Sequence, residues 1–219
     1  MEKNYEIIRK CPLFRHIKDE DLIKIQNCMG GRIVKFSKNQ PILEEGDPAR
    51  NMCIVVSGAV LMVRDDYNGN RVLINRVGPG ELFAESVAIT ENAQMPLTII
   101  AENDCEVLMM DSDRVMNPCY KNCYFHIHII KNLLNVIAGK NIWFAQRIEI
   151  TSRRTTRDKI MAYLVMEANY RGRKEFTIPF NRQQLADFLG VERSAMSAEI
   201  SKLKDDGIID TNRSWFKLL

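Results

Sequence analysis

Apolar and polar positions follow three different patterns along the chain. The first 28 residues favour two helical pieces separated by Pro12, with Asp19 as the cap of the second. Across residues 32–111, apolar residues instead form short β-rich runs, interrupted by turn residues about every 8–12 positions. This spacing is typical of an antiparallel sandwich or barrel. The runs are 33–34, 41–43, 53–56, 59–63, 72–74, 97–100 and 107–110.

Asn68-Gly69 is the clearest turn signal within this β-rich region. Both residue types tolerate the positive φ that a tight hairpin turn requires. The pair therefore predicts a hairpin between the run that ends at Val63 and the run that begins at Val72.

A long helix is predicted over residues 121–150, which contain no proline and a single glycine. Apolar positions alternate three and four residues apart for three heptads, which is the a/d pattern of a coiled coil. Asn141 occupies an a position, where it can fix register and a two-stranded state. The predicted dimer seam comprises Ile127, Ile130, Leu134, Ile137, Asn141, Phe144 and Ile148.

A second apolar row lies beside the seam and contains Ile129, Leu133, Val136 and Trp143. One face of the helix is therefore free to meet a partner helix while the other packs on the sheet. The alternative is a helix buried within its own chain, which two apolar rows also fit.

The last third of the chain has the pattern of a winged helix-turn-helix. Asn181 with Gln184 forms a capping box for a short helix, which ends before Gly190. A second helix starts near Arg193 and ends before Gly207. Residues 208–210 and 215–218 then pair as a wing around 212–214. Two helices about a glycine turn, followed by a wing, are typical of DNA-binding domains.

Charge is distributed unevenly between the two halves. Residues 1–118 carry 14 Lys and Arg against 18 Asp and Glu, whereas residues 119–219 carry 17 against 10. An acidic first half and a basic second half assign a polyanionic partner to the C-terminal half. A chance imbalance on a solvated surface is the alternative.

Cysteine and histidine gather at the start of the long helix, at Cys119, Cys123, His126 and His128. On a helix the first three share a face, but His128 points elsewhere, and no second cluster completes a four-ligand zinc site. We therefore interpret them as packed thiols and hydrogen-bonded or exposed imidazoles, and no metal or cofactor is predicted.

Several classes of protein are excluded by what the sequence lacks. No stretch of 18 apolar residues is present, so no membrane span is expected, and the charged N-terminus lacks a secretion signal. Six sparse cysteines indicate reduced thiols in a cytoplasm. A cupin-like metalloenzyme is the remote alternative. Its metal would need clustered histidines, yet all three lie outside the β-rich runs, and no P-loop, G-x-S-x-G or zinc-protease motif occurs.

The order of these elements resembles the CRP/FNR superfamily of bacterial regulators over nearly the whole chain. Residues 42–47 and 54–58 are similar to the family's roll signature, and residues 80–85 resemble the start of its phosphate-binding cassette. Residues 183–191 and 197–209 resemble its C-terminal motif. The resemblance implies a homodimeric transcription regulator without catalytic activity, whose effector binds between the roll and the long helix.

Two departures from the family pattern bear on function. Cyclic-AMP-binding members end the cassette with Arg followed by Ser or Thr, and here those positions are Met95 and Pro96. Met has no charge to clamp a cyclic phosphate, and Pro has no backbone donor. The effector is therefore an unidentified small molecule other than cyclic AMP. Its candidate pocket comprises Gly80, Glu81, Leu82, Phe83, Ala84, Met95 and Pro96.

Iron–sulfur sensing of the FNR type needs closely spaced N-terminal cysteines, but Cys11 and Cys28 lie far apart. Thiol or redox sensing, haem sensing and effector-independent DNA binding remain as alternatives.

The second helix of the motif also departs from the family's usual Arg, Glu and Arg, because the matching positions are Arg193, Ser194 and Ala198. We expect Arg193 to contact a guanine in the major groove, and Arg182 and Gln183 to contact phosphate. The alternative for Arg193 is a solvated side chain or a charge pair with Glu192 at the start of the helix. The predicted DNA-binding residues are Arg182, Gln183, Arg193, Ser194, Ser197, Ala198 and Lys202.

These observations predict an α+β fold with an N-terminal antiparallel β-roll of the jelly-roll type, a long dimerisation helix and a C-terminal winged helix-turn-helix. The expected domains are 1–118 for effector sensing, 119–150 for dimerisation and 151–219 for DNA binding. The expected partners are a second copy of the chain and pseudo-palindromic double-stranded DNA, with RNA polymerase as a further candidate.

Overall fold

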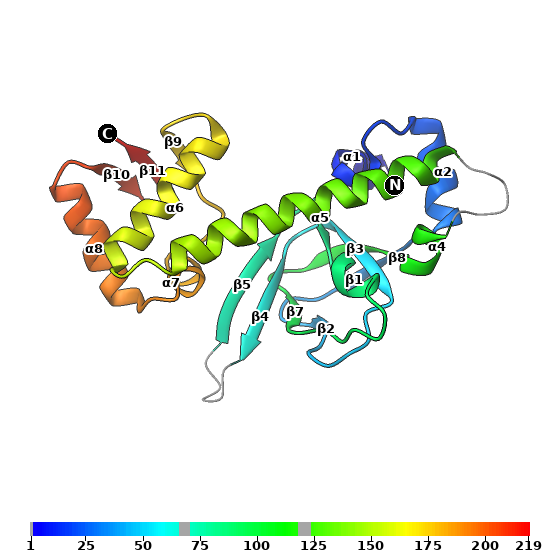
Figure 1. The fold of residues 1–219 in the computed structure, drawn as a ribbon, viewed down its shortest axis with the longest axis horizontal. Helices are drawn as coiled ribbons and strands as arrows, with labels where there is room; N and C mark the ends of the chain where they lie inside the picture. Colours follow the sequence, from blue (N-terminus) through cyan, green and yellow to red (C-terminus); the bar gives the residue numbers. More distant parts are fainter. Residues whose placement is uncertain (1, 66–70, 118–123) are drawn as a thin grey trace. The chain divides into compact units, whose positions relative to one another are not determined.

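The computed structural model describes residues 2–65, 71–117 and 124–219. The chain divides into two compact units. One contains Met1–Arg64 and Asn75–Lys140, and the other contains Asp65–Ile74 and Asn141–Leu219. The long helix α5 (Tyr124–Thr151) contributes residues to both units. Figure 1 shows α5 as one continuous helix.

The N-terminal half consists of three short helical segments followed by two four-stranded antiparallel sheets. The strand orders are β1-β8-β3-β6 and β2-β7-β4-β5. The predicted β-rich runs all fall within or overlap these strands, although the Asn68-Gly69 turn lies outside the described residues. The elements are α1 (Glu2–Lys10), η1 (Pro12–Phe14), α2 (Asp19–Cys28), β1 (Arg32–Phe36), β2 (Pro41–Leu43), β3 (Asn51–Ser57), β4 (Val60–Asp65), β5 (Arg71–Val77), β6 (Leu82–Phe83), α3 (Glu85–Ala88), β7 (Thr98–Ala101), β8 (Cys105–Asp111) and α4 (Ser112–Met116).

The middle residues of strands β3 and β8 are apolar on both faces of the sheet, and both faces are buried there. Cys53 and Val55 of β3 point into the core between the two sheets. Met52 and Ile54 point to the opposite face, where the N-terminal helices and the first part of α5 cover the sheet. Strands covered on both sides lose the usual alternation of apolar and polar residues.

The first half of α5 is fixed on the roll by the second apolar row. Ile129 and Leu133 are buried in the core beneath the helix. The buried Asn132 amide donates to the backbone oxygens of Leu13, at 3.0 Å, and Arg15, at 2.8 Å. These two hydrogen bonds join α5 to the end of η1.

The predicted seam has the opposite environment from the second row. Ile127, Leu134 and Ile148 are 72%, 63% and 66% exposed, although such side chains are normally buried. Asn141 and Phe144 are also exposed, and Ile130 and Ile137 are half-buried. An exposed apolar stripe therefore runs along α5 and comprises Ile127, Leu134, Phe144 and Ile148, whereas Ile137 packs partly against the core beneath the helix.

The C-terminal unit packs three helices around a small sheet. Helix α6 (Thr156–Arg171) precedes β9 (Glu175–Thr177), α7 (Arg182–Leu189), α8 (Arg193–Asp205), β10 (Ile209–Asn212) and β11 (Trp215–Leu218). The antiparallel sheet has the order β10-β11-β9. The predicted wing is confirmed, with Ile209 opposite Leu218 and Asn212 opposite Trp215. The α+β fold predicted from the sequence is therefore confirmed.

No helix in the described ranges has both the length and the hydropathy that crossing a membrane requires.

Candidate nucleic-acid interface

Helices α7 and α8 begin at caps that satisfy their first backbone N–H groups. Asn181 and Gln184 exchange the two hydrogen bonds of a capping box at the start of α7. Gly190 ends α7 with a φ of 62°, a left-handed conformation that favours glycine. Below the turn, apolar side chains from both helices are fully buried with those of α6 and β11. They include Ile160, Tyr163, Leu164, Leu185, Phe188, Met196, Leu203 and Phe216.

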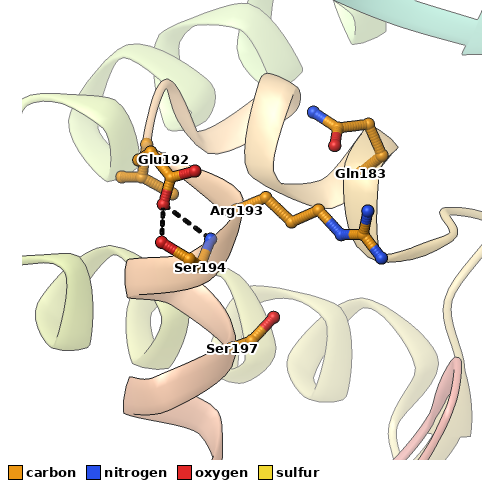
Figure 2. A pocket seen from close by; sticks show the side chains of 6 residues that line it. Gln183, Glu192, Arg193, Ser194 and Ser197 are labelled. Carbon is orange, nitrogen blue, oxygen red and sulfur yellow. Dashed lines mark hydrogen bonds between the residues drawn. The ribbon is translucent and has the colours of Figure 1, made fainter.

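An open hollow of about 830 Å³ lies between α7 and the first turn of α8. Its lining residues are Gln183, Val191, Glu192, Arg193, Ser194 and Ser197. Figure 2 shows the Arg193 side chain reaching from α8 toward Gln183 on α7. Four of the predicted DNA-binding residues thus line one concave, solvent-open surface, which is where the first turn of such a helix approaches base edges.

Ser194 is engaged within its own helix. The carboxylate of Glu192, at the N-cap of α8, accepts from the Ser194 hydroxyl and from the backbone N–H groups of Ser194, at 2.6 Å, and Ala195, at 3.0 Å. These hydrogen bonds lower the pKa of Glu192 from its usual value, with the Ser194 hydroxyl as the largest cause. The cap is therefore an anion at neutral pH. This cap was not predicted from the sequence, which suggested Glu192 only as an alternative partner for Arg193.

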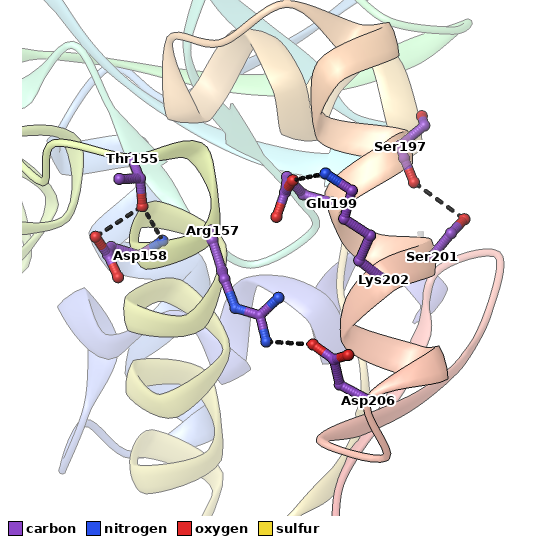
Figure 3. A network of polar contacts seen from close by, with 8 residues as sticks. All are labelled: Thr155, Arg157, Asp158, Ser197, Glu199, Ser201, Lys202 and Asp206. Carbon is purple, nitrogen blue, oxygen red and sulfur yellow. Dashed lines mark hydrogen bonds and ion pairs between the residues drawn. The ribbon is translucent and has the colours of Figure 1, made fainter.

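The outer face of α8 carries two further predicted DNA-binding residues. Ala198 is exposed. Lys202 is also exposed, and its ammonium pairs with Glu199 at 2.7 Å. Figure 3 shows this pair beside the Arg157–Asp206 ion pair, which joins the start of α6 to the C-cap of α8 at 2.6 Å. The far end of α8 is thus tied to α6.

Arg182 has different surroundings from those expected of a phosphate contact. Its guanidinium lies 5.0 Å from the centre of the Phe216 ring and donates to the Thr211 hydroxyl at 3.2 Å. Burial lowers the pKa of this guanidinium from its usual value. Arg182 therefore joins α7 to the wing. Arg213 is an exposed cation at the tip of the wing. It adopts a positive φ of 52° in the turn between β10 and β11.

Most residues of the candidate effector pocket are part of the roll's packing. Glu81 accepts from the Gly78 N–H at 2.6 Å, and the Gly80 N–H donates to Val55 at 2.8 Å. Pro96 is exposed. The other four residues of the candidate pocket have side chains buried in the core: Leu82, Phe83, Ala84 and Met95.

Beside these residues, Glu85 begins α3 with a carboxylate that is almost fully buried. Its Oε1 is 2.8 Å from the Lys140 ammonium of α5, which also donates to the Leu82 carbonyl at 2.5 Å. The other oxygen, Oε2, is buried without a hydrogen-bond partner among the described residues. The preceding Ala84 has a φ of 61°, a conformation that non-glycine residues seldom adopt. This ion pair joins residues 55 positions apart and was not predicted from the sequence.

Of the four described cysteines three are buried and Cys28 is half-buried, and of the three histidines only His126 is buried. Cys11, Cys53 and Cys105 are buried, and burial raises the pKa of Cys11 to about 11 and of Cys53 to about 12. His126 is buried, with Nε2 3.3 Å from the Arg114 carbonyl. Cys119 and Cys123 lie outside the described residues. Elsewhere in the described part of the chain, no three His, Cys, Asp or Glu residues are arranged to hold a metal.

Two different domain models match the two halves of the chain. The cyclic nucleotide-binding domain model matches residues 33–121, and the Crp-like helix-turn-helix domain model matches residues 158–219. The chain is 21% identical over 199 residues to the cyclic AMP receptor protein of Thermus thermophilus, a match that covers 90% of this chain and 88% of that protein.

Many solved structures share the fold, including the following two. FixK2 from Bradyrhizobium japonicum has a TM-score of 0.65 at 20% identity, covering 86% of this chain and 92% of FixK2. The c-di-GMP responsive global regulator CLP of Xanthomonas campestris has a TM-score of 0.60 at 16% identity, covering 89% and 97%.

The roll, the helix-turn-helix and the wing together define a DNA-binding transcription regulator. Both domain models occur in the expected order, and they are domains of regulators rather than of enzymes. The chain belongs to the CRP/FNR superfamily.

Proposed function

We propose that this regulator binds pseudo-palindromic DNA as a homodimer, with α8 of each protomer in the major groove. The observation that carries the DNA contact is the hollow at the start of α8, where Arg193 and Gln183 are exposed above a closed apolar core. Arg193 can take O6 and N7 of a guanine together. Ser197 and Ala198 are short enough to let the backbone of α8 approach the bases, and Lys202 lies one turn further on.

The proposed dimer uses the exposed stripe of α5. Burying apolar side chains such as Ile127, Leu134 and Ile148 against a second copy would remove them from water, which is the main favourable term in association. Asn141, at an a position within the stripe, would favour a parallel, two-stranded arrangement.

We assign residues 1–118 to effector sensing, 119–150 to dimerisation and 151–219 to DNA binding. The exposed faces of the last segment also offer surface for RNA polymerase.

Within that scheme the effector is a small molecule other than cyclic AMP. Met95 is only 2% exposed and Pro96 has no N–H, so neither supplies the cation or the donor that a cyclic phosphate needs. The relatives do not fix the effector, because one is named for cyclic AMP and another for c-di-GMP. Titration calorimetry with cyclic AMP should give no binding at micromolar concentrations. Micromolar binding with enhanced DNA affinity would overturn this assignment.

A second candidate is DNA binding without an effector, and the Lys140–Glu85 ion pair favours it. This pair joins α3, which begins at the last of the cassette residues 80–85, directly to α5. If it replaces a ligand, wild-type protein should bind its site without any addition, and Lys140→Met should weaken that binding.

The DNA-binding proposal is tested by selection from a random duplex library. We expect the wild-type protein to enrich an inverted repeat, and enrichment of no sequence would overturn the proposal.

A further inference from the structure

The carboxylate of Glu192 occupies the donors at the start of α8. The first backbone N–H groups of a helix have no partner within it, and together with the helix dipole they form an anion-binding position. Here Glu192 accepts from two of these N–H groups, those of Ser194 and Ala195. The Ser194 hydroxyl donates to the same carboxylate oxygen, Oε2. A DNA phosphate therefore finds these two donors taken.

The same carboxylate places a negative charge at the edge of the DNA-binding hollow. Glu192 is exposed and lines the hollow together with Arg193 and Gln183. Figure 2 shows it turned back onto Ser194, while Arg193 extends away from it across the hollow. Its lowered pKa keeps it ionised at neutral pH. A phosphate that approaches the start of α8 therefore meets a fixed anion.

We propose that Glu192 is a specificity-determining residue that acts by repelling the DNA backbone from the start of α8. Ser194 is its positioning residue, because the hydroxyl holds the carboxylate in place. This inference rests on the proposed role of α8 in the major groove.

The effect of this repulsion differs between correct and incorrect DNA. On the correct site, base contacts by Arg193 fix the distance between α8 and the backbone. On other sequences, binding depends on phosphate contacts alone, and the protein shifts to maximise them. A fixed anion at the leading end of the helix opposes that shift. Glu192 thus lowers affinity most where base contacts are absent, and specificity is the difference between the two affinities.

The experiment compares Glu192→Gln and Glu192→Ser with the wild type on the selected duplex and on a scrambled one. Serine is itself a good N-cap, so the second variant removes the charge while preserving the helix start. The matched control is Asp205→Asn, which removes one negative charge from the opposite end of α8. About 18 Å separate the two ends at 1.5 Å per residue, more than the screening length in physiological salt.

Both Glu192 variants should bind the scrambled duplex roughly fivefold more tightly, and the selected duplex less than about twofold more tightly. If a phosphate takes the freed N–H groups, the salt dependence on scrambled DNA should steepen by about 0.9 per protomer. Asp205→Asn should leave both affinities nearly unchanged. Ser194→Ala should give a smaller gain in the same direction. Circular dichroism should show that each variant is folded, which separates this gain from non-specific binding by unfolded protein.

Three results would overturn the inference. The first is no gain on scrambled DNA in either variant. The second is an equal gain in Asp205→Asn, which would make the effect one of net charge. The third is a loss confined to one base pair of the selected duplex, which would make Glu192 a base contact. If wild-type protein selects no sequence at all, the proposed DNA recognition fails instead, and the gain on scrambled DNA is still measurable.

Discussion

The Lys140 ammonium lies 2.8 Å from the Glu85 carboxylate, and the two residues are 55 positions apart in the chain. Glu85 is buried at the start of α3, and Lys140 reaches it from α5. A carboxylate in this position is tolerated because a cation accompanies it. The pair connects the short helix that follows Leu82 and Phe83 to the helix that carries the exposed apolar stripe.

Lys140→Met should therefore lower the free energy of unfolding by about 2–4 kcal/mol, because it leaves Glu85 charged and buried without a cation. Adding Glu85→Gln should restore most of that loss, since the buried charge is then absent. Urea unfolding followed by circular dichroism measures both effects. Lys131→Met removes an exposed lysine from the same helix and should change stability by less than about 0.5 kcal/mol. If the double variant is as unstable as the sum of its single variants, the two groups do not act as a pair.

Dimerisation is tested on the two most exposed seam positions of the first half of α5. Ile127→Glu with Leu134→Glu should give a monomer at micromolar concentration, because each charge would be buried without a partner in the dimer. Light scattering measures the mass. The control, His128→Glu with Asn135→Glu, adds the same charges one position further along and should remain dimeric. A wild-type monomer, or a control that dissociates equally, would count against the seam.

Arg193→Ala should cost about 1–3 kcal/mol on the selected duplex and relax the preference at one base pair per half-site. The reason is that the guanidinium is exposed in the hollow, free to contact a guanine edge. Binding isotherms on selected and scrambled duplexes separate this loss from a loss of backbone contact. Equal weakening on both duplexes would mean that Arg193 contacts phosphate.

Arg182→Ala is the comparison for Arg193→Ala, because its guanidinium is half-buried against Phe216 and Thr211. It should lower the stability of the C-terminal unit, while leaving the base preference of correctly folded protein unchanged.

Much of this architecture could be predicted because its causes are local. The 3/4 repeat of α5, the capping box at Asn181 and the turn at Gly190 depend on residues within a few positions of one another. The apolar runs of β3 and β8 were recognised as strands, although the burial of both their faces depends on contacts with distant elements.

The contacts that the sequence did not predict join residues far apart in the chain. Asn132 bonds to carbonyls more than 100 residues earlier, and Lys140 pairs with Glu85. Arg182 was expected to contact phosphate because it opens α7. Its side chain also reaches the wing, where the guanidinium lies over the Phe216 ring and donates to the Thr211 hydroxyl. Helical spacing cannot show which of two nearby surfaces an arginine will contact.

Thiol sensing requires a cysteine that reacts as a thiolate, and burial of Cys11 and Cys53 disfavours the thiolate. With a pKa of about 11, Cys11 is about one part in a thousand thiolate at pH 8, and Cys53, at about 12, is less ionised still. Iodoacetamide should therefore leave both unmodified in native protein at pH 8 and modify both after unfolding in urea, as measured by mass spectrometry. Rapid labelling of either residue in native protein would restore the redox alternative.

The central claim is that two copies of α8, related by a two-fold axis, read two half-sites on one face of the DNA. Such half-sites have centres about 34–36 Å apart, one helical turn. The most direct test is the affinity of wild-type protein for its selected duplex with five base pairs inserted between the half-sites. This insertion rotates one half-site to roughly the opposite face of the DNA. The account predicts a fall in affinity to the level of scrambled DNA, and unchanged affinity would contradict it.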